Sequence, residues 1–163
     1  FFEKTRELWL DIDERNIDFY FNGNMNASGK RSIIIDYFNR FKNSIIIDSD
    51  TGRKNKSDYN LSYYKLFVRS VYGLCPHQSN WPGDPKTKWT YRFIESLMSG
   101  AIPVLFTEAD LGDNFIKGFV FKWDTEFINV NSFDKPSKVD QINNYELALE
   151  RFTLPSAKFP KLY

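Results

Sequence analysis

The sequence predicts an α/β protein with a doubly wound, mainly parallel sheet of about five strands and helices on both faces. Short apolar runs alternate with segments whose apolar residues have helical spacing, and short links join them. Right-handed crossovers between such strands produce a Rossmann-like sheet. Since 163 residues fit one domain, we expect residues 1–163 to form a single one.

The first half of the chain supplies two strands and two helices. IDFYFNG (17–23) has the pattern of a strand that ends at a turn glycine. RSIIIDYFNRFKN (31–43) has apolar residues at helical spacing, and SIIIDSD (44–50) is a second strand. A charged loop (51–58) then leads to a helix with a stripe of aromatic and aliphatic residues, LSYYKLFVRS (61–70).

The second half continues the alternation. A proline stops the third strand, and an eleven-residue loop with two prolines and a glycine follows it. Loops of that length inside a compact domain are usually functional or disordered. The expected elements are a strand at 71–76, the loop at 77–87, a helix at 88–99, strands at 101–106 and 118–123, and a helix at 138–152.

Parallel sheets of this kind bind ligands beyond the carboxyl ends of their strands, where the strand order reverses. In this chain that edge is formed by Gly23 and Asn24, by residues 48–51, by Pro76 and His77, and by the loop after Phe106. We therefore expect the functional site there.

The helix at 88–99 carries two stripes. One is apolar and predicts core packing: Phe93, Ile94, Leu97 and Met98. The other is polar, with Lys88, Arg92, Glu95 and Ser99, and Gly100 is placed to end the helix. Spacing alone allows Arg92 and Glu95 to be an exposed ion pair, worth a few tenths of a kcal/mol.

The position of this helix favours a second interpretation. Its amino end follows the long loop and so lies at the ligand-binding edge, where free amides attract phosphate. Lys88 and Arg92 would add cationic donors, and Glu95 could accept hydrogen bonds from a ribose diol. This chemistry suits a nucleoside diphosphate.

Residues 64–106 resemble the exostosin-type glycosyltransferases. The family pattern is a strand ending in L-C-P, a loop, S-x-R-x-x-E, a helical turn and G-x-I-P-V. Upstream, FYFNG (19–23) followed by Arg31 looks like the family's short strand with glycine, and downstream Trp123 to Phe127 looks like its W-x-x-x-F segment. The matching residues in this chain are Leu74-Cys75-Pro76, Thr90-x-Arg92-x-x-Glu95 and Gly100-x-Ile102-Pro103-Val104.

The resemblance implies the donor-binding C-terminal half of a glycosyltransferase-B fold. In that half Glu95 would bind the ribose, and Thr90 and Arg92 would face the diphosphate. His77 stands where family members often carry arginine or lysine, and it either donates a hydrogen bond to a phosphate oxygen or is an ordinary loop residue. The implied reaction is inverting, metal-independent transfer from a nucleotide sugar, expected to be a UDP-sugar, to a glycan acceptor. The general base would belong to an N-terminal half or partner subunit outside this chain.

Alternatives from other classes remain open. Family members of this fold often carry a glutamate eight residues before Glu95, where this chain has Thr87. A fucosyltransferase-like enzyme that uses a GDP-sugar shares the glycosyltransferase-B half and carries Y-x-x-E-K, whereas here Tyr91 precedes Glu95 by four residues and no lysine follows the glutamate. A nucleotide-binding module without chemistry, or an interaction domain whose site has decayed, also fits.

Other features limit cofactors, partners and location. The net charge of +1 gives no global case for nucleic acid, and no apolar run approaches the roughly 18 residues of a membrane span. The single cysteine, Cys75, is expected to be a buried thiol.

Asp48 and Asp50 form a D-x-D pattern that suits Mg²⁺ or Mn²⁺, although solvated turn carboxylates are the favoured interpretation. A cytoplasmic location is favoured over the Golgi lumen.

Overall fold

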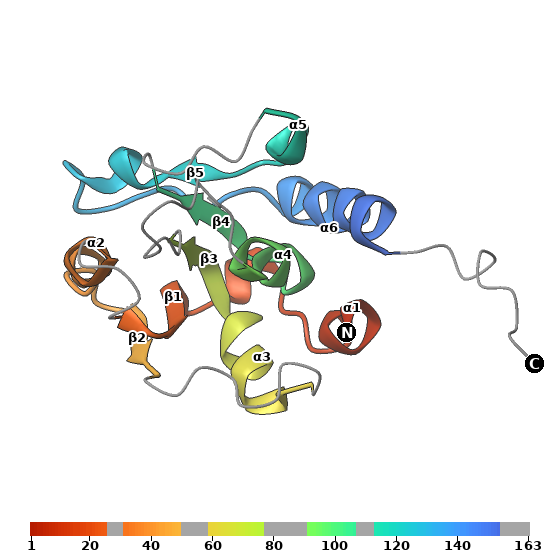
Figure 1. Ribbon diagram of the computed structural model, residues 1–163, viewed down its shortest axis with the longest axis horizontal. Helices are drawn as coiled ribbons and strands as arrows, with labels where there is room; N and C mark the ends of the chain where they lie inside the picture. Colours follow the sequence, from red (N-terminus) through yellow and green to blue (C-terminus); the bar gives the residue numbers. More distant parts are fainter. Residues whose placement is uncertain (26–30, 50–58, 77–90, 107–112, 154–163) are drawn as a thin grey trace, which may run out of the picture.

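The computed structural model describes residues 1–25, 31–49, 59–76, 91–106 and 113–153, with the backbone alone at 31–34 and 113–114. Within these ranges one sheet runs in the order β2-β1-β3-β4-β5, and every neighbouring pair is parallel. This confirms the predicted Rossmann-like α/β class (Figure 1). The strands are β1 (Ile17–Gly23), β2 (Ile45–Asp48), β3 (Ser70–Cys75), β4 (Ile102–Leu105) and β5 (Lys122–Trp123).

The strand order reverses between β1 and β3. From β1 the chain moves outward to β2, then returns past β1 to β3 and continues in the opposite direction to β4 and β5. At such a reversal the connections leave the two central strands toward opposite faces, which opens a crevice at the carboxyl edge. The end of β1 at Gly23 and the end of β3 at Cys75 border this position.

The helices divide between the two faces as right-handed crossovers require. α2 (Arg31–Phe38) covers one face, while α3 (Leu61–Phe67) and α4 (Tyr91–Met98) cover the other (Figure 1). α6 (Lys138–Phe152) packs against α4. In the described part of the chain no helix is long and apolar enough to cross a membrane. The remaining elements are α1 (Phe2–Arg6), α5 (Asp113–Ile116) and the 3-10 turns η1 (Ile12–Glu14) and η3 (Asp124–Phe127).

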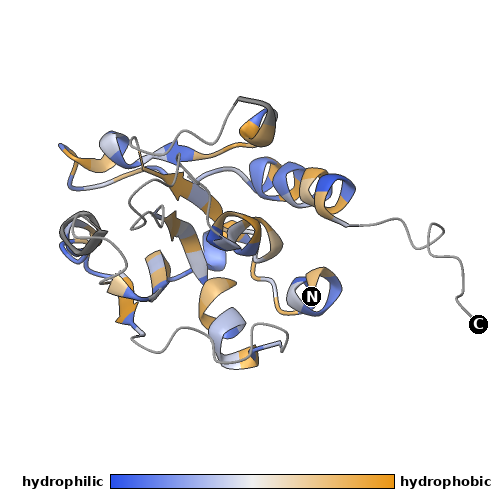
Figure 2. Cartoon of the chain, in the orientation of Figure 1, coloured by the Kyte–Doolittle hydropathy of each residue, from blue (hydrophilic) through white to orange (hydrophobic). Residues whose placement is uncertain are grey.

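Aromatic residues fill both sides of the sheet, and Figure 2 shows the apolar residues gathered on β2, β3 and β4. On the α2 face Phe19 stacks on Tyr72 at 5.3 Å between ring centroids and also contacts Phe38. On the opposite face Tyr20 packs against the rings of α3, and Phe93 of α4 is fully buried. Successive strand residues alternate between these faces, so both cores draw on the same strands.

Several element boundaries differ from the predictions. α2 ends at Phe38, not at residue 43, because the next amides bond three residues back, with Phe41 N donating to Phe38 O at 3.2 Å. Phe41 is nevertheless buried, as its helical spacing predicted. The strand expected at 118–123 contains only the two residues Lys122 and Trp123. The helix at 138–152 and the strand at 17–23 match their predicted bounds.

A buried arginine holds the carboxyl end of α4 at the amino edge of the sheet. Arg15 is 2 % exposed, and its guanidinium donates to Ser70 O at 2.6 Å and to Ser99 O at 2.8 Å. Its Nε donates to Leu10 O, and burial lowers its pKa to about 9. Gly100 follows at φ 66°, so it ends α4 in the left-handed conformation that glycine tolerates, as predicted.

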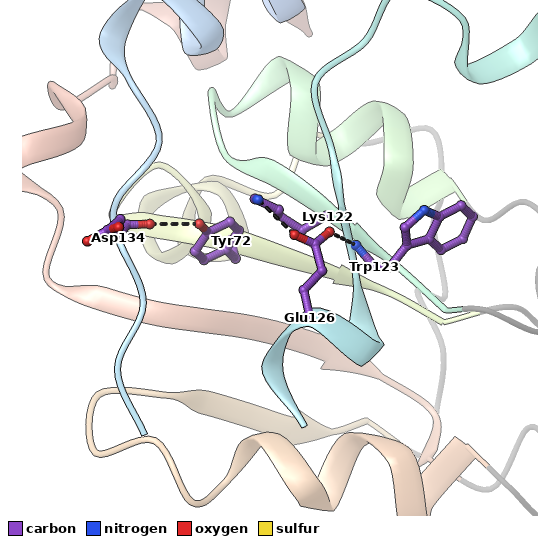
Figure 3. Close-up of polar contacts among 5 residues, drawn as sticks. All are labelled: Tyr72, Lys122, Trp123, Glu126 and Asp134. Carbon is purple, nitrogen blue, oxygen red and sulfur yellow. Dashed lines mark hydrogen bonds and ion pairs between the residues drawn. The ribbon is translucent and has the colours of Figure 1, made fainter. Parts of the chain in front are cut away.

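The segment after β5 is fixed by polar contacts that Figure 3 shows. Glu126 accepts from Lys122 Nζ and from Trp123 N, both at 2.8 Å. Burial alone would raise the pKa of Glu126, but these two bonds outweigh it and lower the pKa. Tyr72 Oη donates to Asp134 O at 3.1 Å, which ties β3 to the chain that covers the α2 face.

Candidate functional site

The carboxyl edge of the sheet carries a turn that the neighbouring strand stabilises. Asp48, at the end of β2, accepts a hydrogen bond from Met25 N at its Oδ1, with a distance of 3.0 Å. Ser49 N donates to Gly23 O at 3.1 Å. Gly23 and Asn24 are therefore held at the end of β1, on the predicted edge. One oxygen of Asp48 positions this turn.

Arg92 reaches from the first turn of α4 across to the end of β1. Its Nη2 and Nε donate to Asn22 O at 2.9 Å and 3.3 Å, and its guanidinium carbon lies 4.7 Å from the centre of the Phe21 ring. The side chain is half-buried. The backbone of Gly23 leaves the room for it, because a Cβ there would lie 1.7 Å from Nη2. The structure thus brings two predicted site residues, Arg92 and Gly23, into direct contact.

Glu95 is one turn further along α4 and lies below the edge. It is 8 % exposed, and its Oε2 accepts a 2.6 Å hydrogen bond from Tyr63 Oη of α3. A buried carboxylate bonded to another helix is not half of an exposed ion pair, so that interpretation of Arg92 and Glu95 is wrong. The short distance is typical of a charge-assisted hydrogen bond.

Ser96 and Cys75 lie beneath these two charges. Ser96 Oγ donates to Arg92 O at 2.7 Å, and Cys75 Sγ lies 3.4 Å from Ser96 Oγ. Cys75 is 3 % exposed, and burial raises its pKa from 9.0 to about 12. The predicted buried thiol is confirmed, and at neutral pH it carries its proton and is a poor nucleophile.

The arrangement is suited to recognition. A guanidinium offers five N–H donors in a planar fork that matches phosphate, and an ionised carboxylate accepts from hydroxyl donors. Arg92 and Glu95 place these two groups three residues apart on one helix, at the point where the strand order reverses. Tyr91, in the same first turn, exposes 67 % of its surface.

Other predicted site residues lie outside the described ranges: Thr90, His77, Lys88 and Asp50. Among the residues that the structure describes, no group of three His, Cys, Asp or Glu side chains is arranged to hold a metal ion.

Sequence reasoning missed Tyr63 and the backbone oxygen of Asn22. Tyr63 lies in the first turn of α3, which begins at the same edge as α4, and that placement was the available signal. It did not distinguish Tyr63 from Tyr64, because both tyrosines are buried and adjacent. A carbonyl acceptor such as Asn22 O has no side-chain signature at all.

Comparisons with protein-family models, with curated proteins and with solved structures return no match to this chain.

Proposed function

We propose that this chain is the donor-binding domain of a glycosyltransferase and holds the nucleoside diphosphate of a UDP-sugar at its carboxyl edge. The observation that carries the proposal is the placement of Arg92. Its guanidinium spans from α4 to the end of β1, where the strand order reverses. Doubly wound sheets bind phosphorylated ligands at this position, and a guanidinium is the side chain best matched to phosphate.

The proposed reaction is displacement at the anomeric carbon of the donor sugar. An acceptor hydroxyl attacks that carbon, its bond to the β-phosphate oxygen breaks, and the nucleoside diphosphate leaves with the bonding electrons. Arg92 would stabilise the negative charge that develops on the leaving diphosphate, because it is held in place before the reaction begins. Glu95 would accept hydrogen bonds from the ribose.

The acceptor and the general base would come from a second domain or a partner subunit. Cys75 is a nucleophilic side chain beneath the site, and its burial and raised pKa disfavour a role in proton transfer. This chain would therefore contribute donor binding and leaving-group stabilisation, while the partner contributes acceptor activation.

Titration calorimetry with UDP and then GDP, each with and without Mg²⁺, tests this proposal. We expect metal-independent UDP binding that weakens at least tenfold in Arg92→Ala and in Glu95→Ala, because hydrogen bonds to charged groups contribute about 1.5–3 kcal/mol each. Matched controls are Arg69→Ala and Glu146→Ala, which remove exposed charges from outside the site. Arg69 bonds Asn16 Oδ1, beside the amino edge of the sheet.

The other outcomes separate the alternatives. A preference for GDP would favour the fucosyltransferase-like enzyme, and equally tight binding of both diphosphates would favour a nucleotide-binding module. Wild-type protein that binds neither nucleotide, or UDP affinity that Arg92→Ala leaves unchanged, would refute the proposal.

A further inference from the structure

A buried hydrogen bond joins α3 and α4 just below the carboxyl edge. Tyr63 Oη donates to Glu95 Oε2 at 2.6 Å, and the two residues are 7 % and 8 % exposed. Each lies within the first five residues of its helix, and both helices begin at this edge. The bond therefore acts on the part of α4 that carries Arg92.

Tyr63 is itself fixed by a hydrogen bond and by contacts with neighbouring aromatic rings. Its backbone N–H donates to Asn60 Oδ1 at 3.0 Å, which caps α3. Its ring packs edge-on against Tyr64 and Phe67 and lies 5.7 Å from the ring of Tyr20. Burial, together with the neighbouring charge of Glu95, raises the pKa of Tyr63 well above its ordinary value. The phenol thus keeps its proton and serves as a fixed donor.

A fixed donor sets the orientation of the carboxylate that accepts from it. The terminal torsion of a glutamate is broad, so an unrestrained carboxylate rotates. An ionised carboxylate has about four acceptor positions, and a bond from Tyr63 is compatible with further bonds from a diol. Since Arg92 and Glu95 are neighbours on one face of α4, a diphosphate on Arg92 brings the attached ribose toward the oriented carboxylate.

We propose that Tyr63 is a positioning residue that orients Glu95 to recognise ribose hydroxyls, so that the site selects ribonucleoside diphosphates over their deoxy analogues. This inference rests on the proposed function, because it needs a nucleotide at the same edge. Tyr63 acts through Glu95 and makes no contact with the ligand.

The test compares the affinities of UDP, 2′-deoxy-UDP and 3′-deoxy-UDP for wild-type protein and for Tyr63→Phe. The wild type should prefer UDP to at least one deoxy analogue by about tenfold, the value of one hydrogen bond to a charged group. In Tyr63→Phe this preference should fall to about threefold or less, since the carboxylate loses its fixed orientation. Tyr64→Phe is the matched control and should keep the wild-type preference, because the ring of Tyr64 stacks on Tyr59.

The affinity ratio separates positioning from a structural role. A merely structural Tyr63 would weaken UDP and its deoxy analogues equally, and this result would overturn the inference while leaving the proposed function intact. A preference that is unchanged or larger in Tyr63→Phe would overturn it as well. Wild-type protein that binds no nucleotide would overturn the proposed function and this inference together.

A second variant keeps the test decisive if Tyr63→Phe does not fold. Glu95→Gln preserves side-chain size and an oxygen that can accept from Tyr63, but it removes the charge that a diol would recognise. The preference for UDP should again fall to about threefold or less. A tenfold preference that survives in Glu95→Gln would overturn the inference.

Discussion

Replacing Gly23 with alanine should remove Arg92 from the edge without unfolding the protein. A Cβ at position 23 would lie 1.7 Å from Arg92 Nη2 and 2.7 Å from its Cζ. Ordinary non-bonded contacts need about 3.5 Å, so the guanidinium must move by about 2 Å. That displacement breaks the 2.9 Å bond to Asn22 O. The two atoms closer than 3.0 Å are the far end of a flexible side chain, and Phe21 Cζ at 3.2 Å needs to move by only a few tenths of an ångström, so the backbone need not shift.

The stability change should be small because two effects oppose each other. Alanine in place of a strand glycine contributes about 0.5–1 kcal/mol by reducing the freedom of the unfolded chain. Loss of the hydrogen bond from half-buried Arg92 to Asn22 O costs about 1.5 kcal/mol, the low end for a bond that involves a charged group. The free energy of unfolding should therefore stay within about 1 kcal/mol of the wild type. Affinity for UDP should fall about tenfold or more, because the positioned charged donor is lost.

Urea denaturation and calorimetry, applied to the same protein samples, measure both quantities for Gly23→Ala. The double variant Gly23→Ala/Arg92→Ala is the control, because two substitutions that act through one contact are not additive. In the Arg92→Ala background the glycine substitution should change UDP affinity by less than about twofold. Gly23→Ala protein that folds and binds UDP like the wild type would refute the role given to Arg92.

Three further predictions concern Arg15 at the amino edge of the sheet and the buried thiol of Cys75. Arg15→Met should lower the free energy of unfolding in urea by about 3 kcal/mol, because it leaves Ser70 O and Ser99 O without their donor. The matched Arg69→Met should cost less than about 0.5 kcal/mol, and equal losses in the two variants would contradict the role given to the hydrogen bonds of Arg15. Native Cys75 should resist thiol reagents at pH 8 until urea unfolds the chain, and rapid native labelling would disprove its burial. Since its pKa rises from 9.0 in the unfolded chain to about 12 in the fold, stability falls with pH across that window, and Cys75→Ala should make this decline shallower.

Much of the fold could be predicted because the relevant signals are local. Alternating apolar runs and helical stripes identified every strand of the described sheet, and short links implied its parallel arrangement. The short elements could not be predicted from local sequence patterns. α1 and η1 have few turns and make contacts with distant residues, such as the bond from Thr5 Oγ1 of α1 to Tyr59 Oη. Such stabilisation comes from tertiary packing, which local patterns do not contain.

The candidate site was predictable in position but less so in detail. The reversal of strand order and the place of α4 led to Arg92, Glu95 and Gly23. Spacing on one helix could not reveal that Glu95 turns toward Tyr63, because α3 and α4 are 32 residues apart at that bond. Nor could it reveal that Arg92 bonds a main-chain oxygen, since every residue carries one.

We propose that a nucleotide binds at the carboxyl edge of the sheet, between β1 and β3. Amide chemical-shift mapping during a UDP titration measures, for each residue, whether the nucleotide changes its surroundings. The largest changes should fall on residues 22–25 at the end of β1 and on residues 91–95 at the start of α4, while Ser70 and Arg15 at the opposite edge stay unchanged. Changes concentrated at the amino edge, or none at saturating UDP, would contradict a nucleotide site between β1 and β3.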